Sequence, residues 1–315
     1  MPENQTHVAS AECTVAAPAD AVFAVLAEVE KWPQFFPSMV HTEYLERTET
    51  SDRVEYWAVT PQEAIRHWIA RRELDQDAGR ITFTQEGAVG PLARLGGTWQ
   101  VTATGPGSTV VSSKHEYTLA EEDPAVAERA KADLERNSGV QFAVIKDTAQ
   151  RREELAELVI SFADELFIAG SVEDCYAVLY EADKWPDRFP HVTSLEMTED
   201  VPNFQFFDMG TKSADGSTHQ MRSVRICLPY RKIVYKQLKT PPLLAAHTGH
   251  WSFTETPEGV IAQTRHAATI RRDRLHVLGE GTTVADARRY LRKVLSANSM
   301  ANLVFTKDYA ERRAE

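Results

Sequence analysis

The chain repeats itself once over almost its whole length. At an offset of 153 residues, Lys31–Pro37 aligns with Lys184–Pro190, and both segments read KWPxxFP. Further matches follow in the same order, among them Gly97-Thr98-Trp99 with Gly249-His250-Trp251. This period is much longer than the roughly 20 to 50 residues of solenoid repeats, so each copy is a whole domain. We therefore expect two tandem domains, residues 1–153 and 154–315.

Both copies predict the same order of secondary structure: a strand, a short capped helix, several strands and a long closing helix. KWPxxFP is expected to end the short helix, because proline disfavours helical backbone at the residue before it. This order predicts an α+β fold, in which a curved antiparallel sheet surrounds the long helix and leaves an interior pocket. The expected ranges are Glu12–Ala16 and Leu158–Ile168 for the first strands, Ala21–Val29 and Cys175–Ala182 for the short helices, and Ala125–Arg152 and Thr283–Arg312 for the long helices.

Charge and composition exclude several classes of protein. The net charge of −11 argues against a nucleic-acid partner, which requires a positive field. No apolar run reaches the roughly 18 residues of a membrane helix, and the first residues lack signal-peptide features, so we expect a cytoplasmic protein without a membrane partner. Three scattered cysteines offer neither a disulfide framework nor a metal site. The two basic tracts, Arg271–Arg274 and Arg288–Lys293, are either solvated faces or a docking site for an acidic partner.

An arginine recurs at the same place in both copies. Period-two spacing places Arg66, Trp68, Ala70 and Arg72 on one strand face, and Met221, Ser223 and Arg225 correspond to the last three. An ordinary strand arginine is solvated on an outer face. The alternative is an interior guanidinium, which needs an anionic or carbonyl-rich partner. Both copies keep the arginine while its neighbours diverge, which favours the interior.

A histidine also recurs in both copies. His115 and His266 are equivalent, and each follows its arginine by about forty residues. Such a histidine is either a hydrogen-bonded structural residue or a general base. On the long helices, Asn137 and Gln141 share a face with Ile145, as do Asn298 and Asn302 with each other. These amides either satisfy nearby backbone groups or bind a ligand carbonyl.

Taken together, these motifs resemble the didomain aromatase/cyclases of bacterial type II polyketide synthases, members of the START-like helix-grip superfamily. The resemblance rests on KWPxxFP, on Trp68–Arg72, on Lys236–Pro242 leading to Gly249-His250-Trp251, and on an Asn-Ser pair in each long helix. It implies first-ring aldol cyclisation, typically C7 with C12, followed by dehydration of a poly-β-ketone. The substrate would be reduced at C9 and tethered to an acyl carrier protein, with a ketoreductase among the other partners. No metal or redox cofactor is needed.

The resemblance also implies roles for individual residues. The pocket arginine of the family matches Arg72 and Arg225, and its acid–base histidine matches His115 and His266. Where some single-domain relatives have an aspartate beside this histidine, the chain has Gln141 and Asn302, so a carboxylate-assisted dyad is not expected. The residues expected to contact substrate are Trp32, Phe35, Arg66, Trp68, Trp99, Gln141, Trp185, Met221, Ser223, Trp251 and Asn302. The alternative function is non-enzymatic binding of a lipid or another hydrophobic small molecule.

Overall fold

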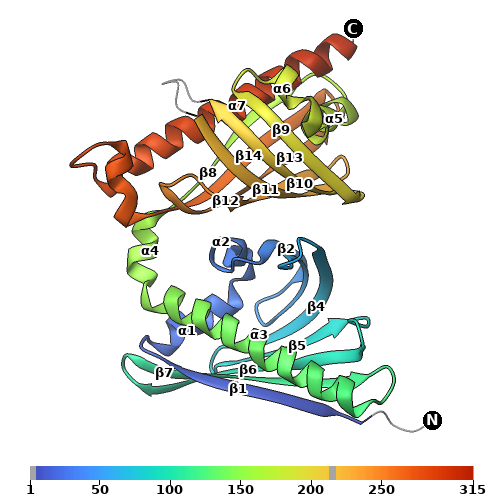
Figure 1. The fold of residues 1–315 in the computed structure, drawn as a ribbon, viewed down its shortest axis with the longest axis vertical. Coiled ribbons are helices and arrows are strands. Elements are labelled where there is room, and N and C mark those ends of the chain that lie inside the picture. The colour runs from blue at the N-terminus through green and yellow to red at the C-terminus, as the bar shows by residue number, and fades with distance from the viewer. Residues whose placement is uncertain (1–4, 213–217, 315) are drawn as a thin grey trace. The chain divides into compact units, whose positions relative to one another are not determined.

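The computed structural model describes residues 5–212 and 218–314, which form two compact units, Met1–Glu153 and Glu154–Glu315 (Figure 1). Each unit is built on one seven-stranded antiparallel sheet. In the N-terminal unit the strands are β1 (His7–Val15), β2 (Met39–Arg47), β3 (Ser51–Val59), β4 (Ile65–Asp75), β5 (Arg80–Glu86), β6 (Leu92–Gly105) and β7 (Ser108–Leu119). In the C-terminal unit they are β8 (Val159–Ile168), β9 (Val192–Val201), β10 (Phe204–Lys212), β11 (Thr218–Leu228), β12 (Lys232–Lys239), β13 (Leu244–Thr256) and β14 (Gly259–Ile270).

The two sheets have the same topology. The strand order is β1-β7-β6-β5-β4-β3-β2 in the first unit and β8-β14-β13-β12-β11-β10-β9 in the second. Alternating burial along β7 and β14 shows that one face of each sheet is packed and the other is wetter, as expected for an antiparallel sheet covered on one side. The predicted α+β fold, with a long helix held by a curved antiparallel sheet, is confirmed.

The short helices differ from the prediction at KWPxxFP. The first helix ends at Ala27, before the motif begins, and the motif itself starts a second short helix with Pro33 in its first turn. Proline is tolerated there because the first helical N–H groups have no partner within the helix. The helices are α1 (Ala19–Ala27), η1 (Val29–Lys31), α2 (Trp32–Phe35), α3 (Pro124–Gln150), α4 (Arg152–Leu158), α5 (Val172–Tyr180), η2 (Ala182–Lys184), α6 (Trp185–Arg188), η3 (Arg272–Leu278) and α7 (Val284–Ala314).

Each long helix packs its apolar side on its own sheet. Phe142 and Ile145 of α3 join one core cluster with Val111 of β7, and Leu303 of α7 joins another with Ala262 of β14. Figure 1 shows α3 and α7 each running across one face of its sheet. The helix expected to end at Arg152 instead ends at Gln150, and α4 carries the chain across the boundary between the units. None of the helices described is long and apolar enough to cross a membrane.

Candidate active site

Arg72 ties the end of α1 to the sheet. Its side chain is 5% exposed and forms a bidentate ion pair with Asp52, the residue directly opposite it on β3, at 2.8 and 2.6 Å. Nη1 and Nη2 also donate to the backbone carbonyls of Leu26 and Ala27, both at 2.9 Å. These carbonyls belong to the last turn of α1, where the helix supplies no donors. Burial opposes the charge of Arg72, but the contacts with Asp52 outweigh it and raise the pKa of the guanidinium.

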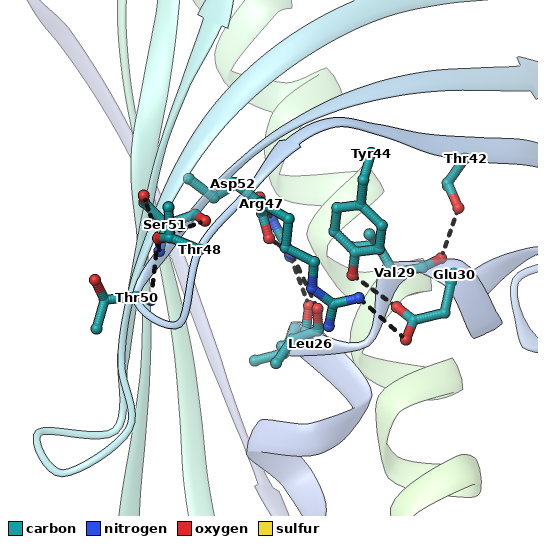
Figure 2. Close-up of polar contacts among 12 residues, drawn as sticks. Leu26, Val29, Glu30, Thr42, Tyr44, Arg47, Thr48, Thr50, Ser51 and Asp52 are labelled. Atoms are coloured by element: carbon teal, nitrogen blue, oxygen red, sulfur yellow. Dashed lines mark hydrogen bonds and ion pairs between the residues drawn. The ribbon is translucent and has the colours of Figure 1, made fainter.

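Side chains of β2 hold the next turn, η1, in place (Figure 2). Thr42 donates to the carbonyl of Val29 at 2.9 Å, and Tyr44 donates to Glu30 at 2.6 Å. Arg47 pairs with Glu30 at 3.8 Å, and its guanidinium lies 4.1 Å from the centre of the Tyr44 ring. The last turn of α1 is therefore bonded to Arg72, and η1, which follows it, is bonded to β2.

Arg225 occupies the equivalent place in the C-terminal unit with a different partner. It is fully buried and donates to the carbonyls of Leu179 and Tyr180, both at 2.7 Å. The residue opposite it, on β10, is Gln205, whose Oε1 accepts from Nε at 3.0 Å and from Nη2. Nε2 of Gln205 in turn donates to Glu199 at 2.7 Å. Among the residues that the structure describes, no carboxylate is hydrogen-bonded to this guanidinium, and burial lowers its pKa.

The geometry decides between the two interpretations of these arginines. The solvated outer face is wrong, because both guanidinium groups are buried. The partner expected for an interior guanidinium comes from the protein itself: a carboxylate and two carbonyls for Arg72, and an amide and two carbonyls for Arg225. These bonds occupy four of the five N–H groups of Arg72. Stabilisation of a substrate oxyanion by either arginine remains a prediction.

His115 lies on the face of β7 that meets the long helix. Ser113, two residues earlier on this face, donates to Ser138 of α3 at 3.2 Å. The His115 ring meets the rings of Phe83 and Trp99 edge-on, at 5.7 and 6.5 Å. Its Nδ1 is buried without a hydrogen-bond partner among the described residues. Burial lowers the pKa of His115, so the imidazole is neutral at pH 7 and can accept a proton.

His266 stands in a larger cluster of titratable side chains. Its Nδ1 lies 2.8 Å from the hydroxyl of Tyr235 and 3.1 Å from Nε2 of His247. The hydroxyl of Tyr235 lies 3.4 Å from the same nitrogen of His247. Burial lowers the pKa of His247 to about 3 and that of His266 to about 4, and it raises the pKa of Tyr235. All three side chains are therefore uncharged at pH 7.

The helix amides differ from one another in burial. Gln141 and Asn302 each keep a side-chain oxygen buried with no hydrogen-bond partner in the described part of the chain. Asn137 and Asn298 are exposed, whereas Gln141 is partly buried and Asn302 is buried. Each i, i+4 step turns an α-helix by about 40°, which carries Asn137 away from the side that buries Ile145. Across residues 5–212 and 218–314, neither candidate histidine is hydrogen-bonded to a carboxylate.

The other residues expected to contact substrate fall into three groups. Arg66 is exposed at the end of β4, with its guanidinium 5.7 Å from the centre of the Trp68 ring. Trp68 stacks on Tyr56 at 5.2 Å, and Met221 accepts from Gln237 at 3.2 Å. Their contact with substrate remains a prediction. The buried members are Trp99, Trp185, Ser223, Trp251 and Asn302. The partly buried members are Trp32, Phe35, Trp68, Gln141 and Met221.

Sequence reasoning missed four residues of these networks. At the offsets of the repeat, Asp52 corresponds to Gln205, Phe83 to Tyr235, and Leu95 to His247. The two copies therefore differ in charge and hydrogen-bonding capacity where the arginines and histidines are alike. A comparison of the copies for differences, and not only for matches, would have singled out Asp52, Gln205, Tyr235 and His247.

The basic tracts are largely satisfied within the C-terminal unit. Arg272 pairs with Glu157 at 2.7 Å, and Arg292 pairs with Asp164 at 2.6 Å. Arg288 donates to the backbone carbonyls of Glu157 and Val159. These contacts favour the solvated-face interpretation over a docking site for an acidic partner.

The buried side chains of His247 and His266 predict that the C-terminal unit is sensitive to acid. Their pKa values are lowered from 6.5 in the folded state, so the unfolded chain binds more protons between about pH 6.5 and 4. Stability is therefore expected to fall as the pH falls through this range, by up to about 1.4 kcal/mol per pH unit for each histidine. Urea unfolding of His247→Leu should show a shallower pH dependence than the unchanged chain. Identical slopes would contradict the prediction.

The fold, together with the buried arginine and histidine of each unit, defines a tandem protein of the START-like helix-grip class. Comparison with known proteins agrees: residues 15–138 match the family described as polyketide cyclase/dehydrase and lipid transport. The chain is 36% identical over 314 residues to the granaticin polyketide synthase bifunctional cyclase/dehydratase of Streptomyces violaceoruber, covering 99% of this chain and 97% of the relative. It is 39% identical over 298 residues to the actinorhodin counterpart of Streptomyces coelicolor, covering 91% and 92%.

Solved structures give the same result. The di-domain ARO/CYC StfQ from the steffimycin biosynthetic pathway is 48% identical, with a TM-score of 0.87, covering 97% of this chain and 99% of that one. BexL, the di-domain ARO/CYC from the BE-7585A pathway, is 38% identical with a TM-score of 0.85 and the same coverage. The chain belongs to the di-domain polyketide cyclase/dehydratase family, and it is an enzyme with cyclase and dehydratase activity.

Proposed function

We propose that the enzyme catalyses first-ring aldol cyclisation between C7 and C12 of a poly-β-ketone reduced at C9, followed by dehydration to an aromatic ring. The observation that carries this proposal is the recurrence of a buried, neutral histidine, His115 and His266, on the helix-facing side of each sheet. Similarity to bifunctional cyclase/dehydratases over nearly the whole chain supports it. The substrate is carried by an acyl carrier protein, and a ketoreductase acts before this enzyme. A cytoplasmic location stays a prediction.

The chemistry suits these side chains. A CH₂ group between two ketones is acidic enough for a neutral imidazole to remove its proton at pH 7. The carbanion attacks the second ketone, and the imidazolium can return the proton to the new alkoxide. A folded chain held in one bend selects which carbons meet. In this proposal, Arg72 and Arg225 act chiefly by fixing the last turns of α1 and α5, because the guanidinium N–H groups donate to carbonyls of these turns. Trp32 and Trp185 follow these turns in the chain.

Reconstitution with a minimal polyketide synthase and a ketoreductase tests the proposal. Adding the enzyme is expected to replace the shunt products with one aromatic product, and carbon-13 labelling is expected to locate the new bond between C7 and C12. A parallel reaction without the ketoreductase tests the preference for a reduced chain. Shunt products unchanged by the enzyme would contradict the proposal. Mass spectrometry of the purified protein tests the alternative, because a co-purified lipid would favour a carrier.

A further inference from the structure

Tyr235 and His266 meet across a glycine on three neighbouring strands. Tyr235 on β12 is directly opposite Gly249 on β13, and Gly249 is directly opposite His266 on β14. A Cβ at Gly249 would lie 2.4 Å from the hydroxyl of Tyr235, so this hydroxyl crosses above the glycine to reach the imidazole. His247, two residues before Gly249, lies on the same face of β13 and completes the cluster.

The N-terminal unit has the same frame without the polar groups. Phe83 is opposite Gly97, which is opposite His115, and a Cβ at Gly97 would lie 3.0 Å from the tip of the phenyl ring. The fold therefore accepts phenylalanine beside this histidine, and Leu95 stands at the position of His247. Apolar residues are cheaper to bury than a hydroxyl and an imidazole. The polar pair in the C-terminal unit is not needed for packing.

Some buried polar atoms of the C-terminal unit, including two in or beside this cluster, have no hydrogen-bond partner among the described residues. Nδ1 of His247, Nε1 of Trp251 and Oδ1 of Asn302 are buried without a hydrogen bond among the described residues. His247 is only 4% exposed, and the Trp251 ring lies 5.0 Å from that of Tyr235. A buried donor or acceptor that stays unpaired destabilises the folded state. The unpaired nitrogens of His247 and Trp251 lie in or beside the cluster, and they point to a ligand that carries hydroxyl or carbonyl groups.

We propose that Tyr235, His247 and His266 form an acid–base relay that removes water from the cyclised β-hydroxyketone in the C-terminal unit. This inference rests on the proposed function and assigns its second step. Hydroxide is a poor leaving group, so elimination needs a proton donor at the oxygen as well as a base at the carbon. The aldol step can use one histidine for both proton transfers. The cluster supplies the second group.

The relay balances protons and electrons. Nδ1 of His247 takes the proton from the carbon beside the ketone, and the electron pair of that C–H bond forms the C=C bond. The C–O bond breaks with its pair on oxygen, and the hydroxyl of Tyr235 gives its proton to form water. The Nε2 proton of His247 then restores Tyr235, either directly over 3.4 Å or through Nδ1 of His266 at 3.1 and 2.8 Å, and exchange of the Nδ1 proton with water returns His247 to its starting tautomer. Burial keeps the imidazoles unprotonated beforehand.

The decisive variant is the double replacement Tyr235→Phe/His247→Leu, which installs the pair that the N-terminal unit already carries as Phe83 and Leu95. In the reconstituted system, cyclisation is expected to continue while dehydration slows about 100-fold or more. A cyclised product heavier by one water than the aromatic product is expected to accumulate; it has the same mass as the linear chain, so time-resolved liquid chromatography separates the two before mass spectrometry. The matched control, Tyr230→Phe/His276→Leu, makes the same changes at exposed positions of the same unit and is expected to behave as the unchanged enzyme.

The outcomes separate this inference from the proposed function. If the unchanged enzyme makes no C7–C12 product, the proposed function fails first. If the folded double variant dehydrates at the unchanged rate, or loses cyclisation and dehydration equally, the relay is wrong. Should the double variant not fold, the single variant Tyr235→Phe, which removes one oxygen atom, is judged by the same two rates.

Discussion

Arg72→Ala is expected to lower the free energy of unfolding of the N-terminal unit by about 3–5 kcal/mol, because it leaves a buried carboxylate without its partner. Asp52 is 7% exposed, and within the described part of the chain its side chain accepts hydrogen bonds only from the Arg72 guanidinium. The carbonyls of Leu26 and Ala27 lose their donors as well. Urea unfolding combined with hydrogen exchange of peptides from each unit measures the loss and assigns it to one unit.

The C-terminal unit supplies the matched control. Arg225→Ala removes the hydrogen-bond donor of the neutral Gln205 amide and of two backbone carbonyls, but no charged group loses a directly bonded partner. Its cost is expected to be smaller than that of Arg72→Ala. Asp52→Asn is also expected to cost less than Arg72→Ala, because it gives Arg72 an amide partner like that of Arg225. Equal losses in the two alanine variants would show that the ion pair does not determine the stability of this anchor.

His115→Gln is expected to lower the rate of cyclisation by about 100- to 10,000-fold, the range of general-base catalysis, while the unit stays folded. Glutamine has a similar size and can hydrogen-bond, but it cannot take a proton at neutral pH. Because burial lowers the pKa of His115, the rate of the unchanged enzyme should be level near pH 7 and fall only in acid below the ordinary value of 6.5. Single-turnover measurements against pH, with preformed carrier-bound chains, give both results.

An exposed histidine in the same unit provides the control. His67 lies on β4 and pairs with Glu55 at 2.6 Å on the surface, so His67→Gln is expected to leave the rate unchanged. A His115→Gln enzyme that cyclises at the unchanged rate would place the base elsewhere. If His266→Gln alone abolished cyclisation, the aldol step would belong to the C-terminal unit instead.

Much of the fold could be predicted because its elements follow from local sequence patterns, and the same patterns occur in both copies. Alternating strands, a capped short helix and a long amphipathic helix recur in the same order in both copies, and both units have the same strand order. The error at KWPxxFP had a local cause too: a proline pattern that ends one helix also begins another, and Pro33 takes the second role. The break at Arg151 between α3 and α4 has no comparable sequence signal.

The sequence by itself determined the duplication, the α+β architecture and the equivalence of Arg72 with Arg225 and of His115 with His266. Only the tertiary structure decided what these residues touch. Asp52 meets Arg72, and Tyr235 reaches His266 over Gly249, because strand register places residues 20 to 31 positions apart side by side. Register arises from pairing along the whole sheet and from the helix that covers it, so it cannot be deduced from the local pattern around any one of these residues.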